Sequence, residues 1–98
     1  MGAALALGIR EEENALFAEL SKVMEKYNHL ERKFGISLVH SHFPMSANET
    51  LYETHDEQNR VLTCVVVPKS QVTEGTLVSQ WQFDESGSAT PSQYCCTL

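Results

Sequence analysis

The chain has 98 residues, enough for one domain with a modest core and too few for two. Seven Lys and Arg stand against 13 Asp and Glu, for a formal net charge of -6. The basic residues are scattered, which excludes a surface that neutralises nucleic-acid phosphates. Apolar residues make up 42% of the chain, so global disorder is also excluded. We therefore expect a single folded domain over residues 1–98 that binds no nucleic acid.

Residues 10–34 carry the pattern of a long amphipathic helix. Three glutamates at residues 11–13 suit the positive end of its dipole, and Gly35 is placed to leave it in a left-handed conformation. The apolar stripe is expected to cover the sheet of its own chain. The alternative is a coiled-coil dimer, which needs three or four heptads, a length that this helix barely reaches. The stripe comprises Leu16, Leu20, Val23, Tyr27, Leu30 and Phe34.

Residues 36–96 predict an antiparallel sheet of four or five strands, which makes the fold class α+β with the long N-terminal helix packed on the sheet. Residues 60–67 are the most apolar run and predict a central strand buried on both faces. Residues 89–96 contain Pro91 and predict an edge strand. Turns are expected at residues 56–59 and 84–88, and Ser46 with Glu49 fits a helix capping box. The other predicted strands are residues 36–43, 50–55 and 76–83.

Two pairs of residues carry the candidate chemistry. His40 and His42 are two apart in a predicted strand and so share a face, as do Glu53 and His55 in the next strand. Pairing of the two strands would gather these side chains at a sheet rim, where they could hold a divalent metal or transfer a proton. The competing and favoured interpretation is ordinary rim residues bonded to water or backbone. We therefore predict no resident metal or cofactor.

The cysteines indicate compartment and a possible lipid anchor. Cys64, Cys95 and Cys96 are odd in number and two are adjacent, which makes a poor disulfide framework and predicts a cytoplasmic protein. Cys64 lies in the most apolar run, where a thiol is usually buried and inert. Residues 95–98 fit a prenylation box on Cys95, but an ordinary C-terminus is the alternative. Membrane attachment is expected only if Cys95 is prenylated.

Two resemblances rest on the histidine segment. His40-Ser-His42 resembles the His-x-His metal motif of cupins, but Glu49 comes too late after it and the later His is missing, so no cupin function is transferred. Residues 35–43 read Gly-x-x-Leu-x-His-x-His-Phe, and residues 81–83 read Trp-Gln-Phe. With the preceding helix, these resemble small proteins of filamentous fungi over roughly residues 27–94. That resemblance implies a helix-plus-sheet fold and brings no established activity.

Two functions follow from these observations. We expect a small intracellular accessory or protein-interaction domain without catalytic activity, which pairs, with itself or another protein, through an exposed edge strand or the helix flank. The alternative is a small lyase, isomerase or cyclase in a secondary pathway, metal-assisted or not, that uses His40, His42, His55 and Glu53.

Overall fold

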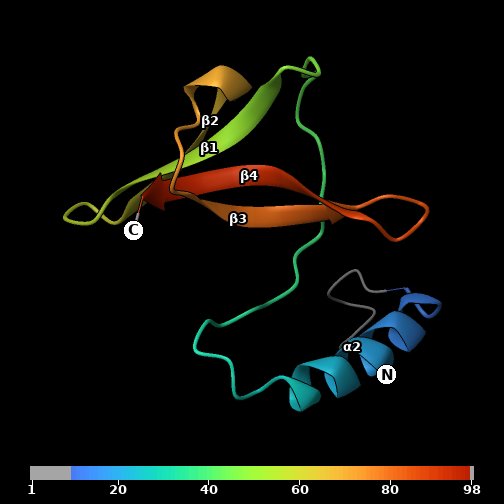
Figure 1. The fold of residues 1–98 in the computed structure, drawn as a ribbon. Helices are drawn as coiled ribbons and strands as arrows, with labels where there is room; N and C mark the ends of the chain where they lie inside the picture. The colour runs from blue at the N-terminus through green and yellow to red at the C-terminus, as the bar shows by residue number, and fades with distance from the viewer. Residues whose placement is uncertain (1–9, 98) are drawn as a thin grey trace. The chain divides into compact units, whose positions relative to one another are not determined.

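A computed structural model describes residues 10–97, which form a helical unit and a sheet unit (Figure 1). The chain divides between Ser37 and Leu38. The first unit contains the helix α2 (Glu13–Lys26), and the second contains the strands and a short 3-10 turn. The α+β class is therefore confirmed. The strands are β1 (Glu49–Asp56), β2 (Val61–Pro68), β3 (Thr76–Phe83) and β4 (Ala89–Thr97), with η1 (Lys69–Gln71) after β2.

Helix α2 is shorter than the predicted residues 10–34. Its last turn closes where the Tyr27 amide donates to the carbonyl oxygens of Val23 and Met24, both at 3.2 Å. Tyr27, Asn28 and His29 follow, and all three residue types are weak helix formers. Gly35 does not take the predicted left-handed conformation, which the structure records at Gly75 and Gly87. Packing of the helix on the sheet stays a prediction, and 14 residues fall short of a coiled coil.

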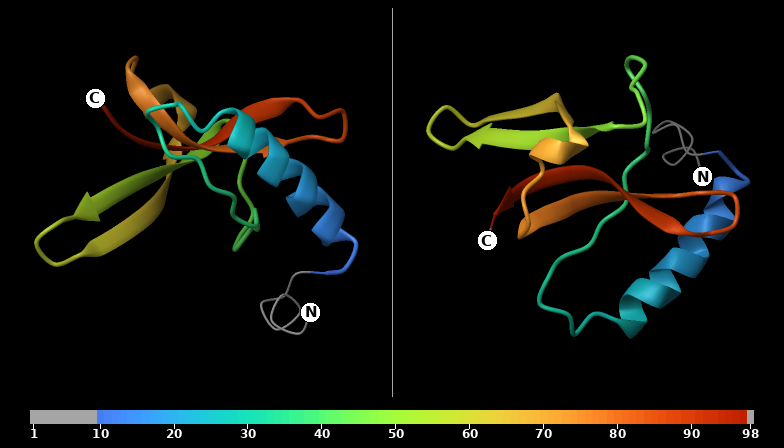
Figure 2. Two further views of the ribbon diagram at one scale, coloured as in Figure 1. Left: turned by 90° about the horizontal axis from the view of Figure 1, so that it is seen from below. Right: turned by 45° about the horizontal axis from the view of Figure 1, so that its top comes forward.

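The sheet is mixed, which corrects the antiparallel prediction. Its strand order is β2-β1-β4-β3. The pairs β1–β2 and β3–β4 are antiparallel hairpins, and their inner strands β1 and β4 run parallel, paired at Leu51–Gln93 and Tyr52–Tyr94. Two hairpins therefore meet along a short parallel joint, which Figure 2 shows from two sides. Hairpins are encoded locally by their turns, whereas this joint brings together residues 42 positions apart.

Residues 36–43 are not a strand, contrary to prediction. They run as a loop, and Leu38 is 82% exposed. Side chains bond to the local backbone in place of a ladder: His40 Nδ1 lies 3.1 Å from the Leu38 carbonyl oxygen, and the Ser41 hydroxyl donates to the Phe43 carbonyl oxygen at 2.8 Å. Such local bonds compete with strand pairing.

The predicted places of two strands in the sheet are also reversed. Strand β2, expected at the centre, is an edge strand, and Leu62 within it is 68% exposed. Strand β4, expected at the edge, lies inside the sheet. Its Pro91 stands opposite Trp81 of β3 and precedes the residues that pair with β1, so the missing N–H removes no bond from the joint.

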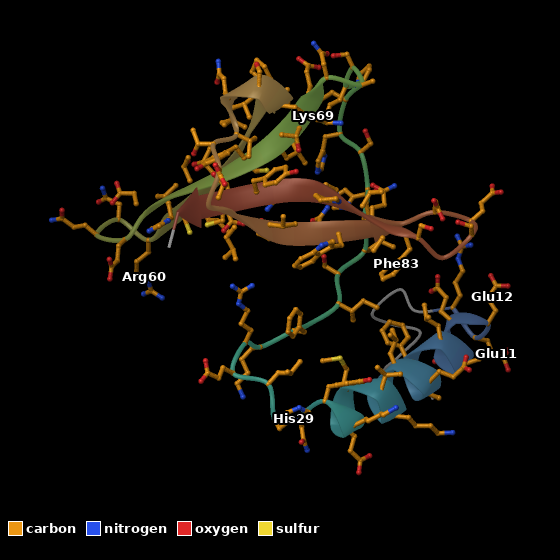
Figure 3. All side chains as sticks on the ribbon, in the orientation of Figure 1. Glu11, Glu12, His29, Arg60, Lys69 and Phe83 are labelled. Atoms are coloured by element: carbon orange, nitrogen blue, oxygen red, sulfur yellow. The ribbon has the colours of Figure 1, made fainter. Side chains whose placement is uncertain are left out.

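Both predicted turns are confirmed. Each begins at an aspartate whose carboxylate accepts hydrogen bonds from later residues of the turn. The Asp84 carboxylate accepts bonds from the Ser86 and Ser88 amides, each at 2.9 Å, and the bond from the Ser86 hydroxyl is the main cause that lowers its pKa. Gly87 has a φ of 86°, which suits glycine. The Asp56 carboxylate accepts from the Asn59 amide at 3.1 Å in the other turn. Figure 3 shows Arg60 at that turn and Phe83 at the end of β3.

The joint between the hairpins contains the best-buried side chain. Among the residues whose side chains are described, Thr50 alone is buried, at 3% exposure, and no hydrophobic residue reaches that degree of burial. The Thr50 hydroxyl on β1 lies 3.5 Å from the Ser92 carbonyl oxygen of β4. Burial in this sheet is therefore concentrated where β1 meets β4.

Candidate functional site

The sheet unit contains a half-open groove of about 470 Å³. One wall is the loop segment 39–45, which includes His40 and His42. The other wall takes residues from all four strands, among them Glu49 and Cys64, together with Lys69 after β2. The groove thus combines imidazoles, a carboxylate, an ammonium group and apolar surface, a composition typical of small ligand sites.

The two groove histidines lie against each other. Their ring centroids are 4.6 Å apart, and the rings meet edge to face at 72°. When His40 Nδ1 carries the proton and donates to the Leu38 carbonyl oxygen, its Nε2 keeps the free lone pair. The two rings are neighbours because the loop folds, and not because they share the face of a strand as predicted.

The other two predicted site residues do not line this groove. Glu53 is half-buried on β1, where its Oε2 accepts a 2.9 Å bond from the Gln93 side-chain amide of β4. His55 is exposed and stands opposite Leu62 of β2. The structure thus brings His40 and His42 together in the loop. It places Glu53 and His55 on β1, outside the groove. Over residues 10–97, no group of three or more His, Cys, Asp or Glu side chains has the geometry of a metal site.

The carboxylate in the groove is that of Glu49, which the capping-box motif positions. Glu49 Oε1 accepts a 2.9 Å bond from the Ser46 amide, and the Glu49 amide donates to the Ser46 carbonyl oxygen at 3.1 Å. The Ser46 hydroxyl turns to Asn48 Oδ1, at 2.5 Å, so half of the motif is formed and no helix follows. The motif predicted as a helix start therefore forms a turn that leads directly into β1.

A second polar cluster joins the two hairpins through Gln93. The Gln93 side chain donates to Glu53 and accepts from the Cys64 thiol, with a Sγ–Oε1 distance of 3.3 Å. Cys64 is exposed on the edge strand, which corrects the prediction of a buried thiol. Partial desolvation raises the pKa of the Cys64 thiol, and the negative charge of Glu53 adds to this effect.

Cys95 and Cys96 also lie in this region, on β4. The Cys95 thiol donates to the Cys96 sulfur at 3.0 Å, and both residues are half-buried. That hydrogen bond, followed by desolvation and the nearby charges of Cys96 and Glu53, raises the pKa of Cys95 to about 12. Proximity of the two sulfurs was missed because adjacent strand residues normally face opposite ways.

Removing the neighbours of Cys95 is expected to lower its pKa in a fixed order. Cys96→Ala deletes the leading cause and should lower the pKa of Cys95 more than Glu53→Gln, which removes two weaker causes, the charge of Glu53 and the hydrogen bond to its carboxylate. The measurement is the alkylation rate of Cys95 against pH, resolved by peptide mass spectrometry. An equal or reversed order would contradict this account of the cluster.

Comparison with known proteins finds no matching family model, no matching curated protein and no matching solved structure. Within the described part of the chain, no helix is long and apolar enough to cross a membrane. Function is therefore inferred from the geometry of this chain.

Proposed function

We propose that this chain is a non-catalytic protein-interaction domain that self-associates through the outer edge of β2. Among the strands of residues 10–97, β2 pairs with β1 alone and ends the sheet order. Its other side therefore offers backbone N–H and C=O groups to a further strand, as in recognition by strand addition.

The regularity of β2 distinguishes it from the other edge strand. Strand β2 holds one register with β1 over its whole length, from Glu49–Pro68 to Asp56–Val61. Strand β3 shifts register against β4 three times, and such irregularities twist an edge away from pairing. The unbroken, uncharged edge of β2 is the observation that carries the proposal.

A second copy of this chain is the partner that β2 fits best. The strand reads Val-Leu-Thr-Cys-Val-Val-Val-Pro, with no charged residue, so two copies meet without like charges facing each other. Charged residues commonly protect natural edges, and here they are absent. Leu62 and Val61, at 68% and 50% exposure, would gain burial that the isolated sheet does not provide.

Sedimentation equilibrium over a range of protein concentrations tests self-association. We expect a monomer–dimer equilibrium that shifts toward dimer as salt rises, because salt screens the repulsion between two chains of net charge -6. A monomer at every concentration and salt level would exclude the proposal.

The remaining features proposed for this protein concern its compartment and its attachment to membranes. Cytoplasmic residence is supported by the three cysteines, which are all free thiols. Prenylation at Cys95 remains a prediction, and it requires this part of β4 to leave the sheet because Cys95 lies inside the strand. Intact-mass measurement of protein from a eukaryotic host would reveal the lipid.

The second candidate is the small His/carboxylate enzyme, and the groove is the observation that favours it. His40, His42 and Glu49 all line the groove, which has a volume suited to a small molecule. Screening small molecules by NMR is the test: binding that shifts the imidazole signals of His40 and His42 and leaves His55 unchanged would support it. Shifts confined to His55, or binding without any His response, would exclude it.

A further inference from the structure

We propose that Cys95 and Cys96 form a dithiol site that chelates a trivalent arsenical, a thiophilic centre with two exchangeable ligands. The site is separate from the β2 edge, so it does not depend on the proposed self-association.

A β-bulge brings the two sulfurs together. Strand β4 pairs with β3 at Thr76–Thr97 and at Val78–Tyr94, which leaves two residues of β4 opposite the single residue Leu77. Those two residues are Cys95 and Cys96. In a regular strand their side chains would point to opposite faces, but a bulge re-aims one of them, and the sulfurs lie 3.0 Å apart.

The sulfur spacing favours a chelated atom over a disulfide. A disulfide requires sulfurs about 2.05 Å apart and Cα atoms at least about 4.4 Å apart, but a trans peptide holds adjacent Cα atoms at about 3.8 Å. An atom with sulfur bonds of about 2.3 Å, the length of a zinc–thiolate bond, at nearly right angles spans sulfurs about 3.3 Å apart. The observed 3.0 Å is close to that span, so chelation needs only a small adjustment.

The number of ligands narrows the class of bound centre. Structural zinc takes four protein ligands, and over residues 10–97 not even three His, Cys, Asp or Glu side chains are arranged around one point. A trivalent arsenic atom that keeps one organic group needs only two sulfur ligands from the protein, which this pair supplies. The nearby charge of Glu53 accounts for part of the raised pKa of Cys95 and marks an anionic side of the site.

The binding step is a ligand exchange without oxidation or reduction. An organoarsenic(III) oxide, R–As=O, reacts with the two thiols to give R–As(S)₂ and one water. Two As–S bonds form, the bond between arsenic and oxygen breaks, and both thiol protons leave in the water. Arsenic stays trivalent throughout. Both cysteines are only half-buried, and their exposed part lets the reagent reach the thiols from solvent.

Phenylarsine oxide and the reduced full-length protein provide the test. Intact-mass spectrometry should show one phenylarsenic group per chain, removed by an added dithiol and retained against a monothiol at equal thiol concentration. Cys95→Ser and Cys96→Ser should each lose the adduct. Cys64→Ser is the matched control and should keep it, because Cys64 bonds to Gln93 and not to the pair.

Three results would overturn the proposal. They are the absence of an adduct on the native chain, its retention in both Cys95→Ser and Cys96→Ser, and its loss in Cys64→Ser, which would move the site to another pair of sulfurs. Circular dichroism of each variant before the reagent is added identifies variants that fail to fold. Should one serine variant misfold, the corresponding alanine variant and the dithiol-against-monothiol comparison on the native chain still decide the outcome.

Discussion

Thr50→Asp is expected to destabilise the sheet unit more than any other single change on β1. Thr50 is 3% exposed at the joint between the two hairpins, where the hydroxyl lies 3.5 Å from the Ser92 carbonyl oxygen. A carboxylate there would be buried against the Ser92 carbonyl oxygen, and an uncompensated buried charge costs about 3–5 kcal/mol. Natural domains are stable by only about 5–15 kcal/mol, so a large share of stability would be lost.

Thr54→Asp is the matched control for this substitution. Thr54 lies on the same strand and the same sheet face, opposite Thr63, and is exposed. Both variants introduce a poor strand former, so the difference between their free energies of unfolding isolates the effect of burial. Thr54→Asp should lower the free energy of unfolding by only about 0.5–1 kcal/mol.

Urea unfolding followed by circular dichroism measures both free energies of unfolding. Burial raises the pKa of an introduced aspartate, so the gap between the variants should narrow at acid pH, where the group is neutral. Equal losses of stability in Thr50→Asp and Thr54→Asp at neutral pH would show that the β1–β4 joint does not hold the hairpins together.

Leu62→Lys is expected to weaken the proposed dimer by about tenfold or more in dissociation constant. Lysine on an edge strand is a common protection against strand addition, because its ammonium group resists desolvation at the new pairing. Leu62 is 68% exposed, so the same substitution should change the stability of the monomer little.

Leu38→Lys is the control for the dimer experiment. Leu38 belongs to the loop outside the sheet and is 82% exposed. Its substitution removes a leucine and adds one positive charge, as Leu62→Lys does. Sedimentation of both variants beside the native chain separates the effect of the edge from that of charge. Equal affinities for the two variants would place the interface elsewhere, and a weaker dimer in Leu38→Lys alone would point to the loop.

Local sequence signals predicted the hairpins well. Residues 76–83 match β3 in full, and residues 50–55 and 60–67 match β1 and β2 within one residue at each end. The aspartates that begin both turns explain this success, because turn residues act on their own neighbours. The parallel joint carries no such signal, since it depends on two residue pairs far apart in the chain.

The failures have physical causes as well. Residues 36–43 have strong strand propensity, but propensity measures fit to a half-buried sheet surface, and side-chain bonds to the local backbone replace the ladder here. High apolar content suggested a central β2, although the same content also suits an edge that pairs with another chain. His40 and His42 lie against each other through a loop and not through the predicted strand, and the approach of Cys95 to Cys96 depends on a bulge that their spacing does not reveal.

Amide hydrogen exchange along β2, measured at low and high protein concentration, tests the central proposal most directly. If two copies pair through this edge, amides of β2 exchange more slowly at high concentration, while those of β3 keep their rates. Concentration-independent exchange in β2, or slowing in β3 or α2 in its place, would contradict self-association through the β2 edge.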